Sequence, residues 1–182
     1  MSCFITGFNI LDDCRMAVSV ILFSTVVALI GVQESNAVTK LVTFETFAVG
    51  DCLKAHYTTP TTGRVSINLH NASGAYVLHA DYRVHWGRNP ITDQPWEHIL
   101  ILNTQKGNEW GPEERVKDIE FTPETLIKLE ICAQANNFSI VMNKKEVATY
   151  DYRVDVTEVR GLEYWNYGYD SKPQKLCVRH SA

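Results

Sequence analysis

After residue 38, apolar and polar residues alternate in short runs, which are separated by clusters of Gly, Pro, Asn and Thr. A period of two is typical of β-strands, because successive side chains point to opposite faces. In the run 64–70, Val65, Ile67 and Leu69 share one face, so we expect a strand with one face in the core and the other in water. No long amphipathic helix is indicated in this part of the chain, which is therefore predicted to be all-β.

The same pattern predicts further strands. The run 76–84 alternates and places His79, Asp81 and Arg83 together on its polar face, and residues 99–103 are apolar on both faces, as in a central strand. Three more strands are predicted at 126–133, 138–142 and 146–150, the last two joined by a turn at 143–145. About ten such strands are enough for a single sandwich of two antiparallel sheets.

The first 37 residues show a different pattern. Ala17 to Val32 is a run of sixteen residues without a charge, and Ser35-Asn36-Ala37 follows it closely. An upright membrane helix needs about 20 apolar residues, whereas small residues after a shorter run are typical of signal-peptide cleavage. We therefore expect a cleaved signal peptide at 1–37, a mature domain at 38–182 and a secreted protein without stable membrane insertion. An uncleaved anchor, or a buried segment in a cytoplasmic protein, is the alternative.

Composition and charge narrow the classes of function. The chain has 45% apolar and 21% charged residues, which excludes disorder over its whole length. Its 17 basic and 21 acidic residues give a formal net charge of −4, so nucleic acid is not an expected partner.

Cysteine and histidine spacing indicates neither a metal site nor a cofactor. The five cysteines include no Cys-x-x-Cys pair, and the histidines lack the spacing of metal ligands. Three cysteines, Cys52, Cys132 and Cys177, follow residue 37. That part of the chain can form at most one internal disulfide and would keep one free thiol, and the spacing does not select the pair.

Polar and aromatic residues concentrate in one spaced pattern. It comprises His79, Asp81 and Arg83, then Asn103, then the stretch Trp110-Gly111-Pro112-Glu113-Glu114-Arg115. Residues three apart point to opposite faces of a regular strand. We expect Gly111-Pro112 to supply the irregularity that brings Trp110 and Glu113 to the same surface.

The order His-x-x-x-Arg followed by Asn-x6-Trp-Gly-x-Glu-x-Arg resembles the sugar-binding signature of the galectins, the β-galactoside-binding lectins. Every position from Asn103 to Arg115 falls at the family spacing, and the resemblance extends over residues 40 to 180 or so. It implies a jelly-roll β-sandwich with one carbohydrate-recognition domain, no metal, no cofactor and no catalytic activity. The implied partners are glycans and glycoproteins that carry terminal galactose-type sugars.

The resemblance also implies roles for single residues. Trp110 would stack on the apolar face of the sugar, His79 and Arg83 would hold its axial 4-hydroxyl, and Asn103 its 6-hydroxyl. Glu113 would bridge the sugar hydroxyls and the arginines. Arg115 and Arg83 would hold its carboxylate in place. The predicted carbohydrate-binding residues are His79, Asp81, Arg83, Asn103, Trp110, Glu113 and Arg115.

The chain departs from the family pattern in four respects. Asp81 stands where galectins usually carry Asn, and a carboxylate, which cannot donate, could tie up Arg83. Tyr82 replaces the usual Pro, and residues 84–98 contain an insertion whose Trp86 and Trp96 either extend the groove or pack the loop. Galectins are also usually made without a signal peptide. The preferred glycan therefore stays open.

Two alternatives to a lectin remain. One is a protein–protein interaction module that kept the sandwich and lost the sugar. The other, a jelly-roll glycoside hydrolase, needs two carboxylates, one with a raised pKa, whereas arginines beside Glu113 favour its ionised form. A shallow sugar site is expected to bind with micromolar to millimolar affinity, so useful avidity needs several sites, and a homodimer is a candidate assembly.

Overall fold

The computed structural model describes residues 38–181 except for 61–62, 85–97, 118, 120–123 and 168–172. The expected signal peptide at 1–37 lies outside the described residues, as does most of the insertion, with Trp86 and Trp96. In the described part, no helix has the length and apolar character that crossing a membrane requires.

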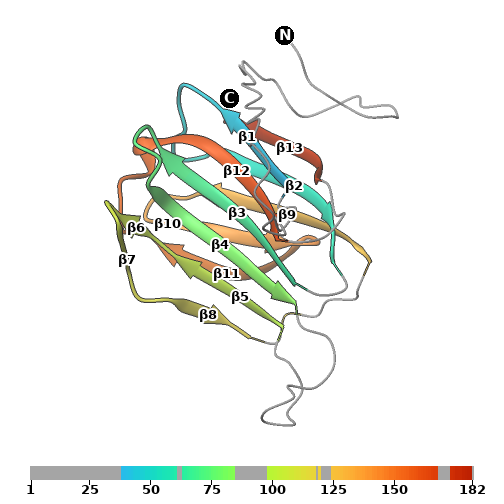
Figure 1. The fold of residues 1–182 in the computed structure, drawn as a ribbon. Helices are drawn as coiled ribbons and strands as arrows, with labels where there is room; N and C mark the ends of the chain where they lie inside the picture. Colours follow the sequence, from blue (N-terminus) through green and yellow to red (C-terminus); the bar gives the residue numbers. More distant parts are fainter. Residues whose placement is uncertain are drawn as a thin grey trace, which may run out of the picture.

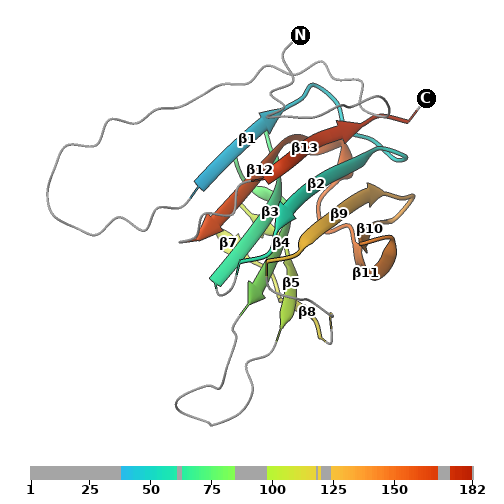
Figure 2. The same cartoon turned by 90° about the vertical axis from the view of Figure 1, so that its right-hand side faces the viewer.

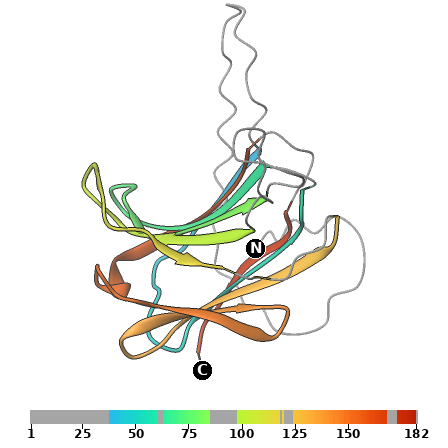
Figure 3. The same cartoon turned by 90° about the horizontal axis from the view of Figure 1, so that it is seen from below.

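Two antiparallel sheets lie face to face as a sandwich (Figures 1 and 3). The six-stranded sheet has the order β1 (Val38–Thr43), β12 (Val159–Tyr167), β3 (Gly63–Asn71), β4 (Tyr76–Val84), β5 (Ile99–Asn103) and β8 (Glu114–Val116). The five-stranded sheet, which Figure 2 shows, has the order β11 (Lys145–Asp151), β10 (Asn137–Met142), β9 (Leu126–Ala133), β2 (Cys52–Thr58) and β13 (Pro173–Arg179). A short hairpin of β6 (Gln105–Lys106) and β7 (Glu109–Trp110) and one 3-10 turn, η1 (Val156–Glu158), complete the described elements. The predicted all-β sandwich is confirmed.

The core lies between the two sheets and is built by the alternating residues. Val65, Ile67 and Leu69 of β3 are buried, as the pattern of 64–70 predicted, and β5 is buried along its whole length. In β9 the buried residues alternate with exposed or half-buried ones. Each strand therefore contributes one face to the core, which is what allows the opposite face of the six-stranded sheet to carry polar side chains.

The polar face of β3 differs from the expectation. Ser66 and Asn68 were predicted to lie in water, but they are 0% and 2% exposed. Both are hydrogen-bonded to carboxylates: Ser66 donates to Asp81 of β4, and Asn68 donates to Glu163 of β12. The long polar and aromatic side chains of the neighbouring strands cover this face, so it is polar without being wet.

The hairpin of β10 and β11 is confirmed, with a shorter turn than predicted. Asn143 and Lys144 have φ values of 50° and 70°, and Lys145 already begins β11. Left-handed φ at both central residues is typical of a two-residue turn whose twist matches that of its strands.

One internal disulfide links two neighbouring inner strands of the five-stranded sheet. Cys52 of β2 and Cys132 of β9 are directly opposite in the register, with their Cα atoms 4.0 Å apart. Cys177 is disulfide-bonded as well. The sequence allowed at most one internal disulfide in 38–182, and the Cys52–Cys132 pair is one, but the thiol that was expected to stay free is not free in this structure.

Candidate functional site

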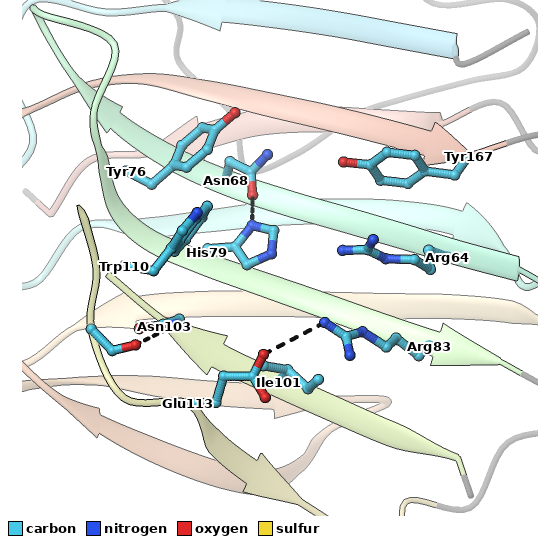
Figure 4. A pocket seen from close by; sticks show the side chains of 11 residues that line it. Arg64, Asn68, Tyr76, His79, Arg83, Ile101, Asn103, Trp110, Glu113 and Tyr167 are labelled. Carbon is cyan, nitrogen blue, oxygen red and sulfur yellow. Dashed lines mark hydrogen bonds and ion pairs between the residues drawn. The ribbon is translucent and has the colours of Figure 1, made fainter. Parts of the chain in front are cut away.

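An open pocket with a volume of about 480 Å³ lies on the outer face of the six-stranded sheet. Figure 4 labels the residues that line it, apart from Gly111: Arg64, Asn68, Tyr76, His79, Arg83, Ile101, Asn103, Trp110, Glu113 and Tyr167. Five of the predicted residues are among them, namely His79, Arg83, Asn103, Trp110 and Glu113. The structure therefore brings together most of the residues that the sequence pattern singled out.

Strand alternation and register explain this convergence. In β4, Leu78, Ala80 and Tyr82 face the core, so His79 and Arg83 emerge on the opposite face. The register places His79 between Asn68 of β3 and Asn103 of β5. Side chains directly opposite on neighbouring strands are close enough to interact, so three separate segments contribute to one wall of the pocket.

Aromatic side chains form one end of the pocket. Trp110 is 48% exposed, and its ring centroid lies 5.6 Å from that of Tyr76 and 5.0 Å from that of His79. In Figure 4 the three rings stand side by side. The indole is thus held in place by its neighbours while half of its surface stays available to a ligand.

The segment between β7 and β8 is irregular, as Gly111-Pro112 predicted. The Gly111 N–H donates to the carbonyl of Thr104 over 3.0 Å. Arg153 donates to the carbonyl of Pro112 over 2.7 Å, and a Cβ at position 111 would lie 2.9 Å from the same Arg153 nitrogen. These contacts hold the backbone in a conformation that is not a regular strand. As a result Trp110 and Glu113, although three residues apart, both line the pocket.

Asn103 lies at the base of this segment. Its Nδ2 donates to the carbonyl of Gly111 over 2.9 Å, and its Oδ1 accepts from the N–H of Thr104 and from Arg153. The side chain is 4% exposed. Although Asn103 lines the pocket, its amide oxygen and one of its two N–H groups already bind the protein, so it mainly organises the segment that carries Trp110.

Asp81 is placed differently from the prediction. Its side chain is fully buried beneath the pocket and accepts from Arg64 over 3.1 and 2.7 Å, from Arg83 over 2.7 Å and from Ser66 over 2.9 Å. Burial alone would raise the pKa of Asp81, but the hydrogen bonds from Arg64 and Arg83 outweigh it and hold the pKa below 3.8. Asp81 therefore orients two arginines and does not itself line the pocket, because they stand between its carboxylate and the solvent. The sequence had indicated that it could tie up Arg83, and it does.

Glu113 and its arginines agree with the prediction. Arg115 donates to one carboxylate oxygen of Glu113 over 3.1 and 2.7 Å, and a nitrogen of Arg83 lies 3.7 Å from the other oxygen. Arg115 is 55% exposed at its side chain and is not one of the lining residues. It braces Glu113 from outside the pocket.

The hydrogen bonds of His79 determine its tautomer. Its Nδ1 lies 2.6 Å from Oδ1 of Asn68, whose Nδ2 donates to the carboxylate of Glu163 over 3.1 Å. Because the carboxylate can only accept, Oδ1 of Asn68 is the acceptor and Nδ1 of His79 carries the proton. Burial lowers the pKa of His79, so the ring is neutral at pH 7 and its Nε2 is left as an acceptor.

Sequence reasoning missed four polar or aromatic residues of the pocket: Arg64, Asn68, Tyr76 and Tyr167. Alternation places Tyr76 on the core side with Leu78, and a register shift in the pairing of β3 with β4 turns it outward instead. Asn68 belongs to a strand that the alternation had identified, so its outward position could have been found. Tyr167 could not, because it comes from β12, and only the register of β12 against β3 sets it opposite Arg64. The guanidinium of Arg64 lies over the Tyr167 ring at 4.7 Å.

Comparisons with known proteins agree with this geometry. The family model described as "Galactoside-binding lectin" matches residues 39–167. "Galectin b" of Aplysina lactuca is 46% identical over 138 residues, covering 75% of this chain and 94% of that protein. "Galactose-binding lectin" of Chondrilla caribensis is 42% identical over 121 residues, covering 66% and 84%.

Solved structures share the fold. A tetrameric galectin from the ball sponge Cinachyrella sp. has a TM-score of 0.66 at 24% identity, covering 78% of this chain and 99% of that one. The homodimeric agglutinin CG-16 from chicken liver has a TM-score of 0.63 at 18% identity, covering 77% and 98%.

Proposed function

The chain belongs to the family of galactoside-binding lectins, the galectins, and from that premise we propose that its pocket binds β-galactoside-type glycans. One observation supports the proposal above the others. A half-exposed indole, Trp110, stands beside the hydrogen-bonding groups of His79, Arg83 and Glu113 in a single open pocket. The chain is thus a carbohydrate-binding lectin, and these residues are its proposed contacts.

The chemistry of the pocket suits a galactose-type ring. Such a sugar has a patch of C–H groups, which stack on the face of Trp110, and an edge of hydroxyls, which need donors and acceptors. Nε2 of His79 and the Glu113 carboxylate accept from hydroxyls, and the guanidinium of Arg83 donates to them. Stacking contributes about 0.5–1.5 kcal/mol beyond buried area, and each hydrogen bond to a charged group roughly 1.5–3 kcal/mol before losses.

The site is held in place before the sugar arrives. Asp81 anchors Arg83, Arg115 braces Glu113, and Asn68 fixes the ring of His79. Groups that are already oriented lose less freedom on binding, so more of each contact appears as affinity. We assign Asp81 a positioning role, which explains how a carboxylate at this place is compatible with sugar binding.

The binding test uses lactose. The purified protein is expected to bind a galactose resin and to elute with lactose in the presence of a chelator. Trp110→Ala removes the stacking face and the apolar area that the sugar buries on it, which together are expected to contribute about 1.4 kcal/mol or more. That free energy corresponds to at least a tenfold loss of lactose affinity, measured by calorimetry. The matched control is Leu126→Ala, which removes a comparably exposed apolar side chain, 41% exposed, from the other sheet. Equal affinities in the two variants would reject the site.

The protein is proposed to be a lectin without catalytic activity. A glycoside hydrolase needs two carboxylates about 5–10 Å apart, one of them protonated. Among the described lining residues, Glu113 is the only carboxylate, and Arg115 and Arg83 lie beside it. In the described part of the chain, no three His, Cys, Asp or Glu side chains gather in a group that could hold a metal ion. Turnover of a chromogenic galactoside that Glu113→Gln abolishes would contradict the proposal.

Secretion is a separate proposal. The apolar run before Ala37 supports it, and so does the Cys52–Cys132 disulfide, since disulfides persist mainly in oxidising compartments. Expression in a eukaryotic secretion host is expected to release a protein into the medium with Val38 as its first residue, measured by mass spectrometry. Retention of the uncleaved chain inside the cells would overturn the proposal.

We also propose that the protein acts as an oligomer. The sponge relative of solved structure is described as tetrameric and the chicken agglutinin as homodimeric. A single site of this kind has an expected dissociation constant between about 1 μM and 1 mM, so several linked sites are needed for firm attachment to a glycan-covered surface. Light scattering after size exclusion measures the assembly, and a strict monomer would contradict this proposal.

A further inference from the structure

The outer face of the five-stranded sheet carries a row of basic side chains. In β2, Leu53, Ala55 and Tyr57 face the core, so Lys54 and His56 point away from it. The same alternation turns Lys128 of β9 outward, between the buried Ile127 and Leu129, and Lys175 of β13 outward, beside the buried Leu176. Figure 3 shows the two sheets as opposite layers of the sandwich, so this face lies on the other side of the domain from the pocket on the six-stranded sheet.

The sheet register aligns these basic side chains. Lys175 is directly opposite His56, and His56 is directly opposite Lys128. Figure 2 shows β13, β2 and β9 as neighbours. Neighbouring strands are about 4.7–4.9 Å apart, so the register places the three residues in a row across them.

The row continues into the turn between β10 and β11. The N–H of Asn143 donates to the carbonyl of Lys128 over 2.9 Å, and the N–H of Lys128 donates to Oδ1 of Asn143 over 3.0 Å. Lys144 and Lys145, both exposed, follow at once. We call Lys175, His56, Lys128, Lys144 and Lys145 the basic band.

Nearby acids do not neutralise the basic band. Burial lowers the pKa of His56 most, and the positive charges of Lys175, Lys128 and Lys54 lower it further against the single opposing charge of Glu130. The carboxylate Oε1 of Glu130 lies 3.9 Å from Nζ of Lys54, and these two residues face each other in the next row of the sheet. Glu146, on the neighbouring β11, accepts a hydrogen bond from Ser139. The lysines of the basic band therefore create a positive electrostatic potential at this surface, although the net charge of the chain is −4.

We propose that the basic band is a second binding site, for a sulfated polysaccharide. A row of lysines presents compact positive charges at short intervals, which complements an anion repeated along a sugar chain. The surroundings disfavour the other polyanionic partners. Of the large apolar side chains that are exposed in the described part of the chain, only Leu126 belongs to this sheet, so a membrane finds little to bury here. A nucleic-acid base needs an exposed aromatic side chain to stack on, and Trp110, the exposed aromatic among these residues, lies at the pocket on the other sheet.

The placement of the two sites has a consequence. The pocket and the basic band lie on opposite faces of one domain, so the protein binds a galactoside and a sulfated polysaccharide at the same time. One molecule then links neutral glycans to an acidic polysaccharide without needing a second subunit.

The test measures binding of dextran sulfate to the full chain by calorimetry between 50 and 200 mM salt. Lys128→Gln/Lys175→Gln is expected to weaken binding at least about tenfold and to reduce the slope of log K against log salt by about 2, because two ion contacts are lost. The control, Lys40→Gln/Lys106→Gln, removes the same charge from β1 and β6 and is expected to bind like the unchanged protein. Both variants should keep the lactose affinity, which shows that they are folded.

Several results would overturn the proposal. These are the absence of dextran sulfate binding, equal loss in both double variants, or competition by lactose, which would place the polyanion in the pocket. Binding to phosphatidylserine vesicles or to DNA in place of dextran sulfate would also overturn it. Because lactose binding is measured separately, failure of this proposal is distinguishable from failure of the galactoside site.

Discussion

Replacement of Asp81 by Ala tests the buried charge cluster beneath the pocket. The change removes an anion that accepts from Arg64, Arg83 and Ser66. Removing one partner of a buried ion pair costs about 3–5 kcal/mol, because the remaining charge is left uncompensated. The side chains of Arg64 and Arg83 are 38% and 30% exposed, so water can partly rehydrate them. We therefore expect the lower end of the range, about 3 kcal/mol.

Urea unfolding measures this loss directly, and thermal melts should show a decrease in Tm of about 6–12 °C, at roughly 2–4 °C per kcal/mol for a chain of this size. Lactose affinity should fall as well, because Arg83 loses the hydrogen bond that orients it. Ser66→Ala is the matched control: it removes a single bond to the same carboxylate and should cost about 1 kcal/mol. If Asp81→Ala is no less stable than Ser66→Ala, the carboxylate is not what holds the arginines.

Four further outcomes follow from the geometry. Lactose affinity should decrease as the pH falls below 6.5 and protonates His79, whose pKa is lowered, because Nε2 then loses its acceptor role; calorimetry between pH 8 and pH 5 checks this. The folded-state pKa of Asp81 is depressed, so its contribution to stability is present above about pH 4 and lost as the pH falls through the folded pKa. The free energy of unfolding should therefore decrease with falling pH in this range, and Asp81→Ala should make that decrease smaller. Gly111→Ala places a Cβ 2.9 Å from Arg153 and should weaken lactose binding more than stability, measured by calorimetry and urea unfolding. Cys52→Ser/Cys132→Ser opens a link across 80 residues and should lower the free energy of unfolding by about 4 kcal/mol, and an unchanged urea midpoint would refute this.

Much of the fold was predictable because strand alternation is a local property. The period of two in 64–70, 76–84 and 126–133 identified which side chains enter the core, and burial in β3, β4 and β9 agrees. The spacing from Asn103 to Arg115 likewise indicated that Trp110 and Glu113 share a surface, since Gly111-Pro112 cannot continue a regular strand.

Other features depend on which strands become neighbours. Ser66, Asn68 and Asp81 look like exposed residues on alternating strands, yet they are buried. The large side chains that cover them come from strands whose neighbours the alternation does not identify. The same holds for the Cys52–Cys132 pair, whose members meet because β2 and β9 are adjacent in the sheet.

The sequence by itself determined the class of fold, most of the side chains that face outward on each strand, and the signature residues Trp110, His79 and Arg83. Only the tertiary structure decided that Tyr167 and Arg64 complete the pocket, that Asp81 lies beneath it, and that a basic band forms on the opposite sheet. The physical reason is one of range. Side-chain direction follows from the backbone of a single strand, whereas sheet order and register arise from contacts between segments far apart in the chain, which alternation within one strand does not specify.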